Sequence, residues 1–138
     1  MEIFDWELVH PRCRSAMMAL ADDLAKSYGL GMTPTRFRPF EGFRDPKRQS
    51  VALRGGTSRA SAWSSPHQYG LAVDFVARVG DGWSWADTHD WEFLARCALA
   101  RGLECQTKGL EWDKSHVQHP VWHRLKAVLK PEISGSMA

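Results

Sequence analysis

The sequence predicts a single α+β domain. Two observations support this class: three stretches repeat apolar residues at helical spacing, and shorter runs rich in Val, Leu and Phe lie between them. The length of 138 residues suits one domain with one core, covering residues 1–138, with a loose tail from about residue 131. We therefore expect helices and strands to share a single core, and the chain to carry one site.

Start and stop signals frame two helices in the first half of the chain. The first begins at Pro11 and ends at Gly29, with apolar residues at helical spacing between them. Asp45 is placed to cap the second, which runs from Pro46 to about Arg54. The run 57–65 after it is expected to be a loop.

Two further helices are expected in the second half. Asp87 or Thr88 is placed to cap the first, whose predicted buried stripe ends before Gly102 and comprises Trp91, Leu94, Ala95 and Ala98. Pro120 begins the last helix, in which an apolar stripe lies opposite basic residues. That stripe suits a core-facing surface better than a membrane contact.

Four segments have the character of strands. They are a strand running into a turn at 35–43, a buried strand at 71–79, a short strand from Leu103, and a strand at 112–118 that carries His116. Asp74 is the one polar residue inside the buried run 71–79. A buried carboxylate needs a partner, so Asp74 is a candidate site residue.

Composition excludes several classes of function. Eighteen Lys and Arg against 16 Asp and Glu give a net charge of +2, too small to predict a nucleic-acid surface. No apolar run is long enough to span a membrane, so no stable membrane insertion is expected. The acidic first ten residues do not resemble a secretory signal, and synthesis in the cytoplasm is expected. The three cysteines lack C-x-x-C spacing and are expected to be reduced, packed thiols.

Two short stretches bring together residue types that bind metal ions. His67 and Asp74 lie seven positions apart, and Asp113 lies three positions before His116. Two histidines and one aspartate can hold zinc and leave a coordination position open for water, as catalytic zinc sites do. Asp113 is then placed to carry a proton, with Glu111 as the alternative. Taken alone, these residues fit ordinary surface or core histidines equally well.

These stretches also follow a longer pattern. S-x-H-x-x-G-x-A-x-D is filled by Ser65, His67, Gly70, Ala72 and Asp74, and D-x-x-H by Asp113 and His116. Upstream stands Gly42-Phe43-Arg44, with Gln49 nearby. In these motifs the chain resembles the D-alanyl-D-alanine carboxypeptidase and L-alanyl-D-glutamate peptidase family of zinc metallopeptidases, which includes many phage endolysins. The resemblance spans residues 42–118.

The resemblance implies a fold and a set of roles. The fold is of the hedgehog/D,D-peptidase type, a small and mainly antiparallel sheet that carries the zinc site, with helices packed around it. His67, Asp74 and His116 correspond to zinc ligands, Asp113 to the general base and Arg44 to the group that stabilises the oxyanion. A surface ion pair with Asp45 or Glu41 is the alternative role for Arg44.

The resemblance also implies a substrate, the stem peptide of peptidoglycan. Asp rather than Glu in D-x-x-H, followed by Val117 and Gln118, resembles the L-alanyl-D-glutamate branch more than the D-alanyl-D-alanine carboxypeptidase branch. A monomeric phage endolysin that reaches the wall through a pore or on lysis is expected. A bacterial autolysin, a recycling enzyme and a non-catalytic zinc module that binds the wall remain alternatives. The tryptophans near the motifs suit either core packing or a groove for the sugar-peptide polymer, and they are Trp63, Trp83, Trp85 and Trp112.

Overall fold

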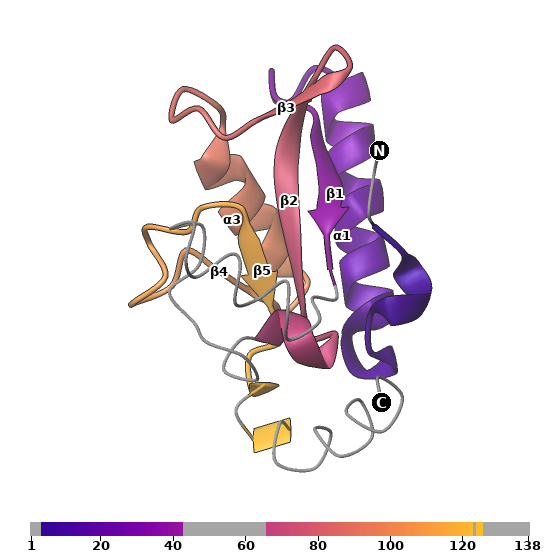
Figure 1. The fold of residues 1–138 in the computed structure, drawn as a ribbon. Coiled ribbons are helices and arrows are strands. Elements are labelled where there is room, and N and C mark those ends of the chain that lie inside the picture. Colours follow the sequence, from indigo (N-terminus) through magenta and orange to yellow (C-terminus); the bar gives the residue numbers. More distant parts are fainter. Residues whose placement is uncertain (1–3, 43–65, 123, 126–138) are drawn as a thin grey trace.

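The computed structural model describes residues 4–42, 66–122 and 124–125. It has the expected α+β architecture, with helices packed on an antiparallel sheet (Figure 1). In chain order the elements are η1 (Trp6–Leu8), α1 (Pro11–Gly29), β1 (Phe37–Glu41), η2 (Pro66–Tyr69), β2 (Ala72–Val79), β3 (Gly82–Ser84), α3 (Trp91–Ala100), β4 (Glu104–Cys105) and β5 (His116–Gln118).

The sheet is organised around β2. Its strands follow the order β1-β2-β5-β4, and β3 pairs with β2 in addition. Ala77 on β2 is opposite Phe37 of β1 and also opposite Ser84 of β3, so β1 and β3 lie on different edges of β2. β5 pairs with the beginning of β2, at residues 72–74, and β3 pairs with its end.

α1 and α3 form where the sequence predicts helices. α1 begins at Pro11, whose ring fixes a helical φ, and the side chain of His10 accepts a hydrogen bond from the Arg12 N–H. α3 begins at Trp91, and its cap is Asp90, so the prediction of Asp87 or Thr88 was wrong. Asp90 is fixed by tertiary contacts instead of a local cap, because its carboxylate accepts from the Thr33 hydroxyl and its N–H donates to the Thr35 hydroxyl.

The core lies between the helices and one face of the sheet. Both helices are behind the sheet in Figure 1, and the buried cluster joins their apolar stripes to alternate residues of β2, among them Val73 and Phe75. Because side chains alternate along a strand, the intervening residues Asp74, Val76 and Arg78 are on the other face. This face is here called the open face because α1 and α3 do not cover it, although Val76 on it is buried. The open face carries the residues that the sequence singled out.

Two strand predictions need correction. The predicted strand at 112–118 is shorter, because residues 107–114 form successive turns and only His116–Gln118 pair with β2. β3 was missed, since three residues beginning with a glycine carry no recognisable strand pattern. The predicted strand at 71–79 is confirmed as β2, although Val79 at its end is exposed.

Several predictions fall outside the described residues. They are the helix at 46–54, the loop at 57–65, most of the last helix and the tail from 131. All three cysteines are free, and Cys13 and Cys105 are buried, as expected. Across the described part of the chain, none of the helices combines the length and apolar character that crossing a bilayer requires.

Candidate metal centre

His67 enters the site from a short turn of 3-10 helix rather than from the open loop that the sequence predicts. This turn, η2, is followed directly by Gly70, which has a φ of +68°. The Gly70 carbonyl accepts a hydrogen bond of 2.7 Å from the His10 N–H, so η2 is fixed against the beginning of α1. A side chain at residue 70 would collide there, because a Cβ would be 2.5 Å from the Leu8 carbonyl oxygen.

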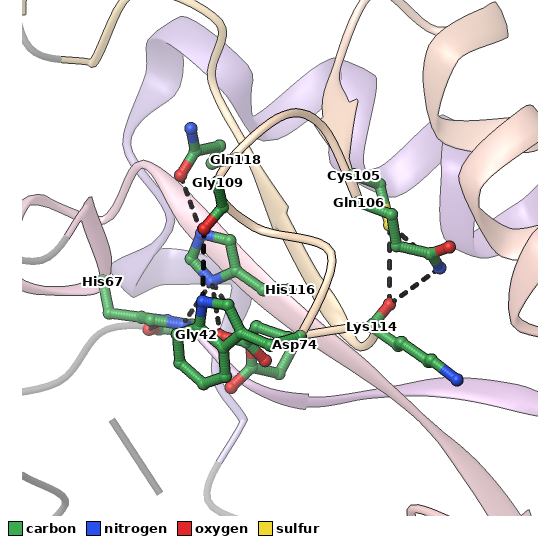
Figure 2. Close-up of polar contacts among 11 residues, drawn as sticks. Gly42, His67, Asp74, Cys105, Gln106, Gly109, Lys114, His116 and Gln118 are labelled. Atoms are coloured by element: carbon green, nitrogen blue, oxygen red, sulfur yellow. Dashed lines mark hydrogen bonds and ion pairs between the residues drawn. The ribbon is translucent and has the colours of Figure 1, made fainter. Parts of the chain in front are cut away.

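Asp74 and His116 are brought together by strand pairing. They are directly opposite one another on β2 and β5, so both side chains are on the open face. His67 then approaches the same point from η2, and Figure 2 shows the three side chains converging. Residues 49 positions apart in the sequence are thus placed in contact.

Three potential ligand atoms meet at close range. His67 Nε2 is 3.1 Å from Asp74 Oδ1 and 3.1 Å from His116 Nδ1, and His116 Nδ1 is 3.5 Å from Asp74 Oδ1. The side chains of His67, His116 and Asp74 are only 3%, 6% and 15% exposed. The cluster is therefore largely withdrawn from water.

The outer edge of each imidazole is fixed by a hydrogen bond. His67 donates from Nδ1 to the Gly42 carbonyl at 2.7 Å. His116 donates from Nε2 to the Gln118 side-chain oxygen at 2.8 Å, and the Gln118 amide donates in turn to the Glu104 carboxylate at 3.0 Å. A neutral imidazole has one ring proton, and the outer bond uses it in both residues. The inner nitrogens therefore present lone pairs.

This geometry fits a small cation. Two nitrogen lone pairs and a carboxylate oxygen face one another, and three acceptors at this range require a positive charge between them. Ligands 2.0–2.1 Å from a tetrahedral zinc ion lie about 3.3 Å apart, close to the spacing seen here. Hydrogen bonds that orient the outer edge of a ligating histidine are typical of metal sites. His67, Asp74 and His116 can therefore hold a metal ion.

The charges in the cluster reinforce one another. Burial by itself would raise the pKa of Asp74, but the neighbouring His67 and His116 outweigh it and hold that pKa well below its usual range. Burial would lower the pKa of His116, but the Asp74 carboxylate accepts a hydrogen bond from the protonated form of this imidazole and outweighs burial, so that the pKa is raised. The carboxylate therefore stays ionised and available as a ligand.

Asp113 is at the edge of the cluster. Its Oδ2 is 3.9 Å from His116 Nδ1, and its side chain is 28% exposed, so it borders both the ligand atoms and solvent. The His116 N–H donates to the Asp113 carbonyl, which fixes the turn that joins the two residues. This is the position that a proton carrier beside the cluster would occupy.

Gln106 fixes the segment that carries Asp113 and His116. Its amide donates to the Trp91 carbonyl at 2.8 Å and to the Lys114 carbonyl at 3.2 Å, as Figure 2 shows for Lys114. The Cys105 thiol also contacts the Lys114 carbonyl, at 3.6 Å. Gln106 has a φ of 56°, rare for a residue with a side chain. The segment is therefore tied to the beginning of α3.

The structure describes only some of the predicted site residues. It brings His67, Asp74, His116 and Asp113 together, whereas Arg44 lies outside the described residues, as do Ser65 and Gln49. Glu111, the alternative proton carrier, is exposed, and its carboxylate accepts from the Gly109 N–H of its own turn.

Sequence reasoning missed the residues that orient the histidines. Gln118 could have been found, because it follows His116 by two positions on a strand and so shares its face. Glu104 carried no such signal, since only the pairing of β4 with β5 places it opposite Gln118. The Gly42 carbonyl likewise reaches His67 only in the folded chain.

Comparisons with known proteins identify relatives by structure. No protein-family model matches the chain, and neither does any curated protein. The L-Ala-D-Glu endopeptidase ChiX of Serratia marcescens aligns over 86% of both chains with 26% identity and a TM-score of 0.53. The LD-carboxypeptidase LdcB, whose structure addresses peptidoglycan recognition, aligns over 86% of this chain with 17% identity and a TM-score of 0.57. This chain spans 64% of LdcB, and that likeness shows the shared fold alone.

Both structural neighbours are peptidoglycan peptidases, and the fold of this chain is the one that they share. The motifs around His67 and His116 form the open-face cluster described above. In its fold and in the order of these motifs, the chain resembles the D-alanyl-D-alanine carboxypeptidase and L-alanyl-D-glutamate peptidase family.

Proposed function

We propose that this protein is a zinc-dependent peptidoglycan hydrolase that cuts the bond between L-alanine and D-glutamate in stem peptides. The observation that carries the proposal is the convergence of three ligand atoms within 3.5 Å of one another, with the Asp113 carboxylate beside them. The similarity to an L-Ala-D-Glu endopeptidase over 86% of the chain supports this bond as the substrate.

The residues of the chain divide the chemistry among them. His67, Asp74 and His116 would hold the metal, and Gly42 and Gln118 keep the imidazole rings in the ligating orientation. A bound zinc ion would polarise a peptide carbonyl and lower the pKa of a water molecule to about 7. Asp113 takes the proton of the attacking water and transfers it to the leaving amine. Arg44 donates hydrogen bonds to the oxygen on which negative charge develops.

The first test is mass spectrometry of purified peptidoglycan incubated with the protein, with and without a chelator. Release of peptides that begin with D-glutamate, abolished by the chelator and restored by zinc, is the expected result. Loss of only a terminal D-alanine would replace the endopeptidase with a carboxypeptidase. Absence of any chelator-sensitive product would favour a zinc module that binds the wall without cutting it.

A substitution separates catalysis from metal binding. Asp113→Asn should keep one zinc per chain and lower kcat by about 100-fold or more, because a general base typically contributes that much. Asp81→Asn, which removes an exposed carboxylate in the β2–β3 turn, is the control and should leave both quantities unchanged. Full activity of the Asp113 variant would remove this residue from the mechanism.

The proposal includes a biological role as a phage endolysin, supported by the resemblance of the motifs to a family rich in such enzymes. The test is expression in a bacterium with and without a co-expressed membrane pore. Lysis only when the pore is present is expected. Absence of lysis with a functional pore and active enzyme would point to an autolysin or a recycling enzyme.

A further inference from the structure

Three aromatic side chains gather on the open face, beside the metal cluster. Phe40 of β1 contacts Trp83 of β3 and Trp85 just after it, with ring centroids 5.0 Å and 5.2 Å apart. Both contacts are edge-to-face, a favourable geometry for aromatic pairs. These three residues are here called the aromatic platform.

The register shows which face the platform occupies. Trp83 is directly opposite Arg78, and the Arg78 guanidinium is 4.7 Å from the centre of the Trp83 ring. Arg78 and Asp74 are both on the open face, because they are four positions apart on β2. The aromatic platform and the metal cluster therefore share one face of one strand.

The platform is not part of the main core. None of its members belongs to the buried cluster between the helices and the sheet or packs against that cluster. Phe40 and Trp83 are half-buried, and Trp85 is 51% exposed. Exposing a large aromatic surface is unfavourable in water, and such patches commonly mark binding surfaces.

A β-bulge places Phe40 at the end of the platform nearest the metal cluster. The register of β1 shifts between Pro39 and Glu41, so that Glu41 is opposite Asp74 and Phe40 is the extra residue. Bulges redirect side chains and are frequent beside active sites. The platform thus begins next to the ligand Asp74 and extends about 13 Å along β2 to Arg78, at about 3.3 Å per residue.

We propose that the aromatic platform binds the N-acetylated sugar chain to which the stem peptide is attached. This inference rests on the proposed function and deepens it. One face of a sugar ring presents C–H groups, which pack on the electron-rich face of an aromatic ring, while the hydroxyl groups stay in water. An exposed indole beside half-buried aromatic rings suits this kind of ligand better than a charged or wholly apolar one.

The distances favour the bond nearest the sugar. Only a lactyl group and one alanine separate the sugar from the L-alanyl-D-glutamate bond, a reach of about 7 Å at 3.3–3.6 Å per unit. The terminal D-alanine bond is about five units away, roughly 17 Å on the same scale. With the scissile carbonyl at the metal cluster, a sugar on the platform therefore matches the first bond. Sugar binding would explain how the site selects that bond.

The experiment compares two substrates that differ only in the sugar: a disaccharide-tetrapeptide and the same tetrapeptide without sugar. The wild type should have the larger kcat/KM on the first substrate. Trp85→Ala should lower kcat/KM on the disaccharide-peptide by about tenfold, the scale of one aromatic contact, and leave the free peptide unchanged. Trp85→Phe should retain most of the preference. Leu30→Ala, which removes an exposed apolar side chain just after α1, is the matched control.

Equal use of both substrates by the wild type would overturn the inference, as would an equal loss on both substrates in Trp85→Ala. If neither substrate is cut, the proposed function fails instead. Binding then decides the inference separately: calorimetry should show tighter binding of the disaccharide-peptide than of the free peptide, and Trp85→Ala should abolish that difference. Equal binding of the two would overturn the inference.

Discussion

Glu104 shows how far the control of a metal ligand extends from the metal. It accepts a hydrogen bond from Gln118, which accepts one from His116, so a carboxylate orients the ligand through an intervening amide. A negative charge at the end of such a chain makes the imidazole nitrogen more basic, and therefore a stronger ligand for the metal. His67 depends on a backbone carbonyl instead, which substitution does not remove.

We predict that Glu104→Ala weakens zinc binding by about tenfold, the lower end of the range for residues that orient metal ligands. Glu104→Gln keeps an oxygen acceptor but loses the charge, and should give a smaller loss. Competition with a chromogenic chelator measures both affinities. Glu111→Ala is the control, because this exposed carboxylate bonds within its own turn. Unchanged affinity in Glu104→Ala would show that Gln118 orients His116 unaided.

The buried thiols predict how stability depends on pH. Burial raises the pKa of Cys13 and of Cys105 from 9.0 to about 12. Because the folded pKa is higher than the unfolded one, the stabilisation is complete below pH 9.0 and is lost as the pH rises from 9.0 towards 12. For each of the two thiols, the free energy of unfolding should decrease by about 1.4 kcal/mol as the pH rises from about 8 to about 10.

Urea unfolding with chelator present measures this loss. In Cys13→Ala, the decrease in the free energy of unfolding between these two pH values should be smaller by the contribution of one thiol. Met17→Ala, also buried in α1, opens a cavity without removing a thiol and should leave the decrease intact. If the free energy of unfolding decreases equally with pH in both variants, ionisation of the buried thiols does not cause the loss of stability at alkaline pH.

At the scale of elements, Gly70 explains why the motif around His67 contains a glycine. The residue has a φ of +68°, and a Cβ there would be 2.5 Å from the Leu8 carbonyl oxygen and 3.0 Å from the His10 nitrogen. Both atoms belong to the backbone and cannot rotate away. Gly80, in the β2–β3 turn, has a φ of +57° but open space around its Cβ position.

A comparison of Gly70 and Gly80 separates the cost of a side chain on a left-handed backbone from the cost of a collision between a Cβ and neighbouring backbone atoms. Gly80→Ala should cost about 1–2 kcal/mol of stability, the price of a left-handed backbone at a residue with a side chain. Gly70→Ala should cost at least about 2 kcal/mol more, because η2 must also move away from the segment before α1. Urea unfolding measures the difference, and zinc titration should show weaker binding only in Gly70→Ala. Similar costs for both would mean that the backbone around residue 70 yields easily.

At the scale of the whole molecule, the metal would join segments that are otherwise far apart in the chain. His67, Asp74 and His116 come from η2, β2 and β5, and the Gly42 carbonyl ties the end of β1 to His67. An ion that binds only the folded arrangement stabilises it by mass action. The whole sheet should therefore respond to the metal.

Zinc at 100 times its Kd should add about 2.7 kcal/mol to the unfolding free energy. For a domain of this size that corresponds to an increase in Tm of several degrees. Differential scanning calorimetry with zinc and with chelator measures the shift. Asp74→Asn should abolish the increase, whereas Asp81→Asn should preserve it. An unchanged Tm on adding zinc to the wild type would contradict a site built across the three segments.

The sequence by itself determined the elements with strong local signals and the identity of the central cluster. Proline at the start of α1, the apolar stripe of α3 and the apolar run of β2 follow local rules, and the motifs singled out His67, Asp74 and His116. Only the tertiary structure decided that Asp90 precedes α3 as its N-cap, that β3 forms, and which roles Glu104 and Gln106 have. These depend on strand register and on contacts between distant segments, which no local pattern encodes. The same holds for the aromatic platform, whose members come from separate strands and meet only when β1 and β3 flank β2.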